Sequence, residues 1–128
     1  MNDLAKWHDK RIKDWKWYFE KIAEIIAKKY TPRKVLDVGC SDGLLLECFY
    51  KYGAECYGVD ISKKALSFAP KEKLNLFIVD IEKENLPFKD ESFDLVDFGT
   101  KLPHHPNSKH IVPQPNSKQS HLSPVLPP

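Results

Sequence analysis

Asp37, Gly39, Gly43 and Asp60 are the residues whose types and spacing are best suited to binding a ligand. Gly39 and Gly43 lie in a turn between an apolar run and a helix-like segment, and such a turn leaves main-chain N–H groups facing open space. Asp60 comes 21 residues after Gly39, where a carboxylate can accept two hydrogen bonds from a ribose diol. The pattern predicts a site for an adenosine-containing ligand. The alternative is a tight turn beside a solvated aspartate.

The elements that must position these residues alternate along the chain. Residues 3–30 carry apolar side chains at three- and four-residue spacing, which predicts an amphipathic helix that ends before Pro32. Four short apolar runs predict strands, at residues 34–38, 55–60, 74–79 and 93–98. Two segments between them predict helices, at residues 44–52 and 62–69. This alternation predicts a parallel sheet, which binds ligands at the carboxyl ends of its strands.

The composition changes abruptly after about residue 100. Residues 1–100 hold all 15 aromatic residues and carry 17 basic against 18 acidic side chains. Residues 101–128 hold seven of the ten prolines, four of the five histidines and no acidic residue. We therefore expect three segments: an N-terminal helix over 1–31, an α/β half domain over 32–100 and an irregular tail over 101–128. The near-neutral body argues against nucleic acid as a partner.

The cysteines and histidines do not form a metal-binding pattern. Cys40, Cys48 and Cys56 are odd in number and form no CxxC pair, which predicts buried, unpaired thiols. His104 and His105 stand in a proline-broken segment with no carboxylate to complete a ligand set. No metal site is expected.

The chain has no targeting or membrane-spanning pattern. No apolar run reaches the roughly 18 residues of a membrane span, and the charged N-terminus is unlike a secretion signal. We expect a cytoplasmic protein without a membrane span. The aromatic residues of the first helix could line an acceptor pocket, but Trp15 lies on the apolar stripe and is expected to pack in the core.

Two nucleotide-binding interpretations differ in their glycine pattern. A dinucleotide site has the pattern G-x-G-x-x-G, but from Gly39 this chain has Ser41 and Leu44 at the other glycine positions. The sequence VLDVGCSDG instead resembles motif I of the class I S-adenosylmethionine-dependent methyltransferases, which is close to hLDhGxGxG. YGVDIS at 57–62 and VDIEKENLPFKDESFDLV at 79–96 are similar to later motifs of that family. The resemblance, to a type 11-like methyltransferase domain, covers roughly residues 33–100.

The resemblance implies an α/β fold with a Rossmann-like, mostly parallel sheet. The family's sheet has seven strands in the order 3-2-1-4-5-7-6, whereas this chain offers strands 1–4 only, so an incomplete sheet of order 3-2-1-4 with an N-terminal helix is expected. The free edge of strand 4 would then be open, and an open edge tends to pair. Three outcomes are possible: the tail covers it, a second copy does, or the chain is a truncated or frame-shifted product that folds poorly. The compositional break favours truncation or a frameshift as the origin of the tail.

The resemblance also implies that the first turn contacts S-adenosylmethionine as the cofactor. By position, Asp37 would lie near the methionine amino end. Gly39 and Gly43 would make room for the cofactor, and Cys40 and Ser41 complete the turn between them.

The next two strand ends would hold the adenosine. By the same correspondence, Asp60 would bind the ribose hydroxyls and Ile61 would lie against adenine. Asp80 would accept from the adenine amino group, and the Ile81 backbone would contact the ring. For Asp80 alone, a turn or helix cap is the alternative.

The implied activity is methyl transfer to a small-molecule, lipid or protein acceptor. Transfer from a sulfonium rests largely on positioning, so no catalytic residue is identified. The (D/N)PP(Y/F) motif of amino-group methylation is absent, since the chain reads Phe98-Gly99-Thr100-Lys101. Two alternatives stay open: an inactive binding or interaction module, and an NAD-dependent oxidoreductase.

Overall fold

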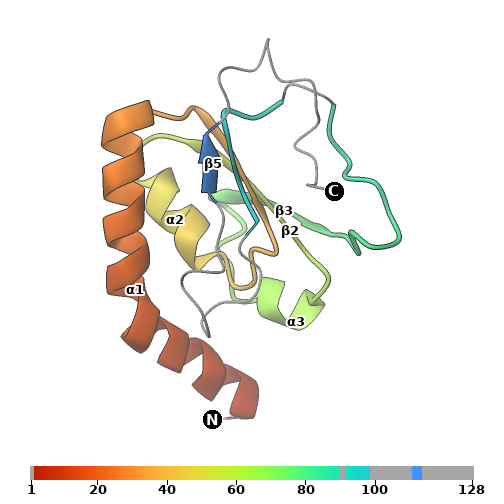
Figure 1. The fold of residues 1–128 in the computed structure, drawn as a ribbon. Coiled ribbons are helices and arrows are strands. Elements are labelled where there is room, and N and C mark those ends of the chain that lie inside the picture. Colours follow the sequence, from red (N-terminus) through yellow and green to blue (C-terminus); the bar gives the residue numbers. More distant parts are fainter. Residues whose placement is uncertain (1, 90–91, 99–110, 114–128) are drawn as a thin grey trace.

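A five-stranded sheet forms the centre of the part of the molecule that the structure describes (Figure 1). The computed structural model describes residues 2–89, 92–98 and 111–113. The strand order is β3-β2-β1-β4-β5, with β1 to β4 parallel and β5 antiparallel to β4. The predicted parallel order 3-2-1-4 is confirmed. The strands are β1 (Lys34–Val38), β2 (Glu55–Asp60), β3 (Leu74–Ile78), β4 (Leu95–Asp97) and β5 (Ile111–Pro113).

Local capping explains where the helices begin and end. The helices are α1 (Asp3–Tyr30), α2 (Leu44–Tyr50) and α3 (Lys63–Leu66). Asn2 Oδ1 accepts the Ala5 N–H at 2.7 Å at the start of α1, and α1 ends at the left-handed Thr31 before Pro32. Ser62 Oγ accepts the Ala65 N–H at 3.1 Å, so the predicted cap of α3 is confirmed. Both α2 and α3 are shorter than the apolar spacing predicts.

α1 and α2 cover one face of the sheet (Figure 1). Phe19 and Ala23 of α1 meet Phe49 of α2 in a cluster of buried side chains that also includes Leu95 of β4. Trp15 packs against this cluster, as its place on the apolar stripe predicts. The burial of this helix face fixes α1 along the sheet and brings its N-terminal turns toward the turn after β1.

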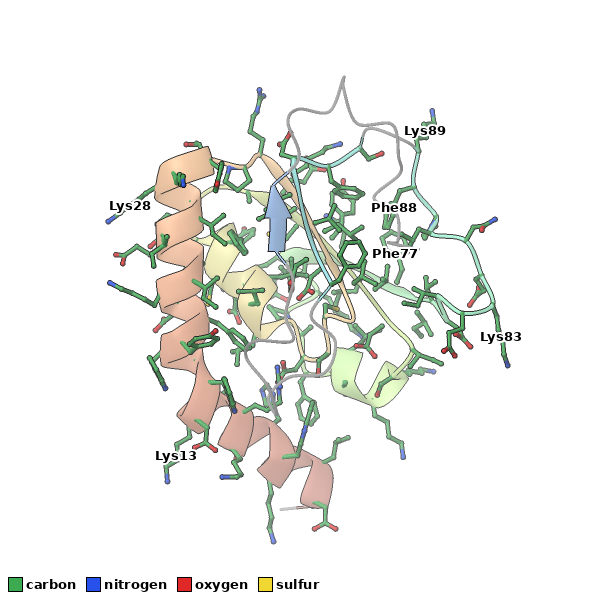
Figure 2. The ribbon with its side chains drawn as sticks, viewed as in Figure 1. Lys13, Lys28, Phe77, Lys83, Phe88 and Lys89 are labelled. Carbon is green, nitrogen blue, oxygen red and sulfur yellow. The ribbon has the colours of Figure 1, made fainter. Side chains whose placement is uncertain are left out.

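A loop rich in aromatic residues covers part of the opposite face. Leu36, Val59 and Val96 form a second buried cluster there. Phe88, from the segment between β3 and β4, lies edge-on to Phe77 of β3 with ring centroids 5.3 Å apart (Figure 2). Such contacts anchor the segment between β3 and β4, whose described residues, 79–89 and 92–94, form no helix.

β5 pairs with the edge of β4 that was expected to be open. Val96 lies opposite Val112, and Asp97 lies opposite Ile111. The expectation of an irregular tail is therefore wrong at residues 111–113, because an extended segment there supplies hydrogen-bonding partners to the unpaired backbone of β4. Of the three outcomes considered, the structure has the tail covering this edge. The paired histidines at 104 and 105 lie outside the described residues.

No helix in the described part of the chain is both long and apolar enough to cross a bilayer. The same residues contain no group of three or more histidine, cysteine, aspartate or glutamate side chains that could hold a metal ion.

Candidate functional site

A cleft of about 450 Å³ lies at the carboxyl ends of β1, β2 and β3. Its lining comes from the residues at or just after each strand end: Val38, Gly39, Val59, Asp60, Ile61, Val79, Asp80, Ile81 and Glu82. Five of the predicted site residues border it, namely Gly39, Asp60, Ile61, Asp80 and Ile81. The other four, which do not border it, are Asp37, Cys40, Ser41 and Gly43. The sheet topology therefore joins the candidates from three separate sequence motifs.

The cleft is lined by carboxylates. Asp60, Asp80 and Glu82 contribute acidic side chains, and none of the described residues that line the cleft is a lysine, arginine or histidine. Sequence reasoning missed Glu82, although its position two residues after Asp80 places it at the same strand end. An acidic cleft attracts ligand groups that donate hydrogen bonds or carry positive charge, and it repels phosphates.

Asp60 is held in a fixed orientation by two backbone groups. Its Oδ2 accepts the Ser41 N–H and its Oδ1 accepts the Ser62 N–H, each at 2.8 Å. A carboxylate has about four acceptor positions, so each oxygen keeps one for a ligand. The arrangement suits a diol whose two hydroxyls donate to the two oxygens.

Asp80 both caps a turn and borders the cleft. Its Oδ1 accepts the Glu82 N–H at 3.0 Å, and its own N–H donates to Glu84 Oε1 at 2.9 Å. The cap that sequence reasoning kept as an alternative is therefore present. Because a carboxylate has further acceptor positions, the cap leaves Asp80 able to accept from a ligand.

Three backbone N–H groups of the turn after β1 donate to acceptors within the protein. The Gly39 and Cys40 N–H groups both donate to the Val59 carbonyl, at 2.7 and 3.0 Å, and the Ser41 N–H donates to Asp60. The expectation that these N–H groups face open space is wrong. The left-handed backbone at Gly39 and Ser41, with φ of 83° and 56°, curls the turn toward β2, so the cleft presents carboxylate oxygens.

Both its backbone conformation and its packing require glycine at position 43. Its φ is 74°, and a Cβ atom would lie 2.8 Å from Leu74 Cδ1 and 3.0 Å from Ala69 Cβ. A side chain at Gly43 would therefore be strained and would clash with the core. Sequence reasoning assigned this glycine to ligand access alone.

The Cys40 side chain lies in the core, against β2. A Cβ on Gly58 would come within 2.6 Å of Cys40 Sγ, so the absence of a side chain at Gly58 makes room for the thiol. Burial raises the pKa of the Cys40 thiol far above its usual range, because the thiolate would lose its hydration. The predicted buried, unpaired state is confirmed for Cys40, Cys48 and Cys56.

Asp37 lies in β1, one residue before Val38, which lines the cleft. It is 2% exposed and lies opposite Asp97 of β4, which is fully buried. Facing residues on neighbouring strands project to the same side of the sheet, so two carboxyl groups share this side. Sequence reasoning missed Asp97, because nothing in the FDLVD run sets a buried carboxyl apart from a solvated one.

Comparison with known sequences identifies the family. The sequence profile described as "Methyltransferase domain" matches residues 36–112. The ubiquinone biosynthesis O-methyltransferase of Alkalilimnicola ehrlichii is 40% identical over 85 residues, which are 62% of this chain and 34% of that protein. The enzyme of the same name from Ralstonia nicotianae is 36% identical over 85 residues, covering 62% of this chain and 36% of its own. The chain spans about a third of the length of these relatives.

Solved structures have the same fold. The plantazolicin methyltransferase BpumL, in complex with SAH (S-adenosylhomocysteine), aligns with a TM-score of 0.52 at 25% identity, over 73% of this chain and 38% of its own. DesVI of Streptomyces venezuelae aligns with a TM-score of 0.53 at 27% identity, over 70% of this chain and 41% of its own. The profile match spans well over half of the chain and takes in all three motifs around the cleft. On this ground the chain belongs to the methyltransferase domain family, within the class I S-adenosylmethionine-dependent methyltransferases.

Proposed function

We propose that the chain binds S-adenosylmethionine in the cleft at the ends of β1, β2 and β3, and that it forms the cofactor-binding part of a methyltransferase. The observation that carries this proposal is the acidic lining, from Asp60, Asp80 and Glu82. S-Adenosylmethionine offers ribose hydroxyls, an adenine amino group, an ammonium and a sulfonium, all of which suit carboxylates. A dinucleotide carries a pyrophosphate, which requires free N–H groups or cations. The Gly39, Cys40 and Ser41 N–H groups are already bonded, which disfavours the oxidoreductase alternative.

Each residue that borders the cleft contacts a different part of the cofactor. Asp60 accepts from the two ribose hydroxyls, and Ile61, which is 65% exposed, packs against adenine. Asp80 accepts from the adenine amino group while the Ile81 backbone contacts the ring. Gly39 allows the ligand to approach the end of β1.

The residues behind the cleft hold its shape. Gly43 lets the turn pack on the core, Cys40 fills the space over Gly58, and Ser41 binds Asp60. Asp37 takes its place near the methionine amino end.

The chain's contribution to catalysis is orientation. When bound, the cofactor would supply a methyl group activated by a sulfonium: an acceptor would attack the methyl carbon in line with the C–S bond, and S-adenosylhomocysteine would leave as a neutral thioether. Asp60, fixed by the Ser41 and Ser62 N–H groups, holds the ribose and so limits where the sulfonium can lie. Holding the reacting atoms in line is the main requirement of such a step.

We propose a small-molecule acceptor that is methylated on oxygen. The names of the relatives, ubiquinone biosynthesis O-methyltransferases, support this choice. A lipid or protein acceptor is the alternative within the same chemistry. The proposed compartment is the cytoplasm, because three buried, unpaired thiols suit a reducing environment.

Calorimetric titration of the full chain tests the cofactor assignment. S-Adenosylhomocysteine and S-adenosylmethionine should bind, and both should bind more tightly than NAD. Tighter binding of NAD would overturn the assignment.

A second candidate is cofactor binding without turnover. The sequence leaves this alternative open, since no catalytic residue is identified in it. Transfer of labelled methyl groups from S-adenosylmethionine to components of a cell lysate separates the two candidates. Binding with transfer supports an active enzyme, and binding without transfer supports the second candidate.

A further inference from the structure

The N-terminal half of α1 is joined to the turn after β1 by a buried ionic cluster. Asp42, the residue between Ser41 and Gly43, accepts hydrogen bonds on Oδ2 from Arg11 Nε and from His8 Nδ1, each at 2.9 Å. Both donors lie on α1, more than 30 residues away in sequence. Figure 1 shows this end of α1 on the same side of the molecule as α3.

The Arg11–Asp42 pair is shielded from water, and His8 lies at its rim with 19% of its side chain exposed. The Asp42 side chain is fully buried, and the side chain of Arg11 is 6% exposed. The Arg11 guanidinium carbon lies 5.4 Å from the ring centre of Trp7, and the His8 ring stacks on Phe68 at 4.4 Å. Ion pairs in such surroundings hold their geometry far more firmly than exposed pairs do. The cluster therefore joins three segments: α1, the turn, and the residues that follow α3.

The turn requires such support because its backbone is unusual. Ser41 has a φ of 56° without being glycine, a conformation that persists only where its surroundings enforce it. On one side its N–H is bound to Asp60. On the other side the next residue, Asp42, is bound to α1. Ser41 is thus held between two carboxylates, one in the cleft and one in the buried cluster.

We propose that Arg11 and His8 are positioning residues for the cofactor site. By fixing Asp42 they keep Ser41 left-handed, which keeps the Ser41 N–H on Asp60 and the Asp60 carboxylate oriented for ribose. Neither Arg11 nor His8 borders the cleft, so both act through the turn. This inference rests on the proposed function for its effect on cofactor binding, but its effect on the turn is independent of any ligand.

The test uses variants that remove the cluster without leaving a lone buried charge. The double variant Arg11→Met/Asp42→Asn removes both charges. The milder His8→Phe keeps a ring against Phe68 and removes only one donor. Lys10→Met/Asp14→Asn is the matched control, since this pair lies on the same helix at 2.7 Å with Lys10 77% exposed.

Two measurements are made on each full-length variant. The dissociation constant for S-adenosylhomocysteine should rise about tenfold in the double variant, within the range typical of coupling between sites, and less in His8→Phe. In the absence of ligand, amide exchange at Ser41 should accelerate relative to Val59, a buried residue of β2. The control pair should change neither value.

The outcomes separate this proposal from the cofactor assignment. If amide exchange accelerates equally at Ser41 and Val59, the double variant is destabilised as a whole, and the positioning role is overturned. It is also overturned if the dissociation constant and the amide exchange at Ser41 both stay unchanged. If the wild-type chain does not bind S-adenosylhomocysteine, the proposed function fails. The Ser41 exchange then still decides whether the cluster holds the turn. If the double variant does not fold, His8→Phe decides by the same two measurements.

Discussion

The Asp60 carboxylate accepts the backbone N–H of Ser41 at 2.8 Å, which joins the end of β2 to the turn after β1. The residue proposed to hold the ribose is therefore also a structural part of the turn that precedes it. A substitution at Asp60 changes the ligand contacts and the shape of the turn together. Experiments at this position must separate the two effects.

Asp60→Asn should weaken S-adenosylhomocysteine binding while leaving the chain folded. The amide oxygen can accept only one of the Ser41 and Ser62 N–H groups, and the loss of a charged hydrogen bond to the ligand costs roughly 1.5–3 kcal/mol, or about 10- to 150-fold in the dissociation constant. Titration calorimetry measures the change, with the exposed Glu72→Gln as control. Asp60→Ala should weaken binding further and also lower the melting temperature, because the Ser41 and Ser62 N–H groups lose their acceptor. Equal affinities in wild type and Asp60→Asn would show that the ribose is held elsewhere.

Gly58→Ala should destabilise the fold through overpacking. The added methyl group would lie 2.6 Å from Cys40 Sγ and 2.8 Å from Leu46 Cδ1, which costs roughly 1–3 kcal/mol in a well-packed core. Urea denaturation measures the free energy of unfolding. A second change, Cys40→Ala, should restore part of the loss because it removes the sulfur atom.

Gly53→Ala is the comparison for the Gly58 substitution. No atom lies within 4 Å of a Cβ at Gly53, although its φ is 87°, so the cost there should be the backbone strain of about 1–2 kcal/mol. Cys40→Ala should not rescue Gly53→Ala. Equal rescue of both glycine variants would mean that the Cys40 contact is not the cause.

The three buried thiols should make the protein less stable at alkaline pH. Burial raises the pKa of Cys48 to about 11 and that of Cys56 to about 12, and it also raises that of Cys40. An unfolded thiol releases its proton near pH 8.5, so the stabilisation is complete below that pH and is lost as the pH rises toward the folded-state values. In this window each thiol should lower the free energy of unfolding by about 1.4 kcal/mol per pH unit.

The Cys56→Ala variant isolates this effect from other groups that titrate at high pH. Its free energy of unfolding should fall less steeply between pH 9 and 11, by about 1.4 kcal/mol per pH unit relative to wild type. Denaturation curves over this range provide the test. Parallel slopes in the two proteins would contradict the assignment of buried, protonated thiols.

Removing β5 should cause self-association. In a chain that ends at residue 110, the outer edge of β4 loses the partner seen at 111–113, and an unpaired edge adds strands from other molecules. Light scattering at increasing protein concentration should show larger species for the shortened chain than for the full chain. The full chain with Val112→Pro, which removes a backbone donor from β5, should behave in an intermediate way. Identical scattering from all three would mean that β5 does not protect this edge.

The elements fixed by local patterns were predictable from the sequence. The four-residue spacing of Trp15 and Phe19 predicts the buried face of α1, and the short apolar runs predict the strands. Both patterns arise because the side chains that pack in the core must be apolar. The strand order followed from the family resemblance. The five predicted residues at the cleft could be found because each lies at a strand end.

Contacts between distant segments were not predictable in the same way. Nothing local to Arg11 or Asp42 indicates that they meet, since the pair depends on how α1 crosses the turn. The hydrogen bonds of the Gly39 and Cys40 N–H groups depend on the left-handed curl toward Val59. The short extended segment of β5 is too brief for a periodic signal, and only the unpaired edge of β4 gives it a partner.

The position of β5 in the chain has a consequence for synthesis. β5 is the last of the described elements to leave the ribosome, and it pairs with β4 as the outermost strand on that side of the sheet. A nascent chain can therefore assemble β1 to β4 while the outer edge of β4 is still unpaired. During that interval the unpaired edge of β4 is accessible to chaperones and to neighbouring nascent chains.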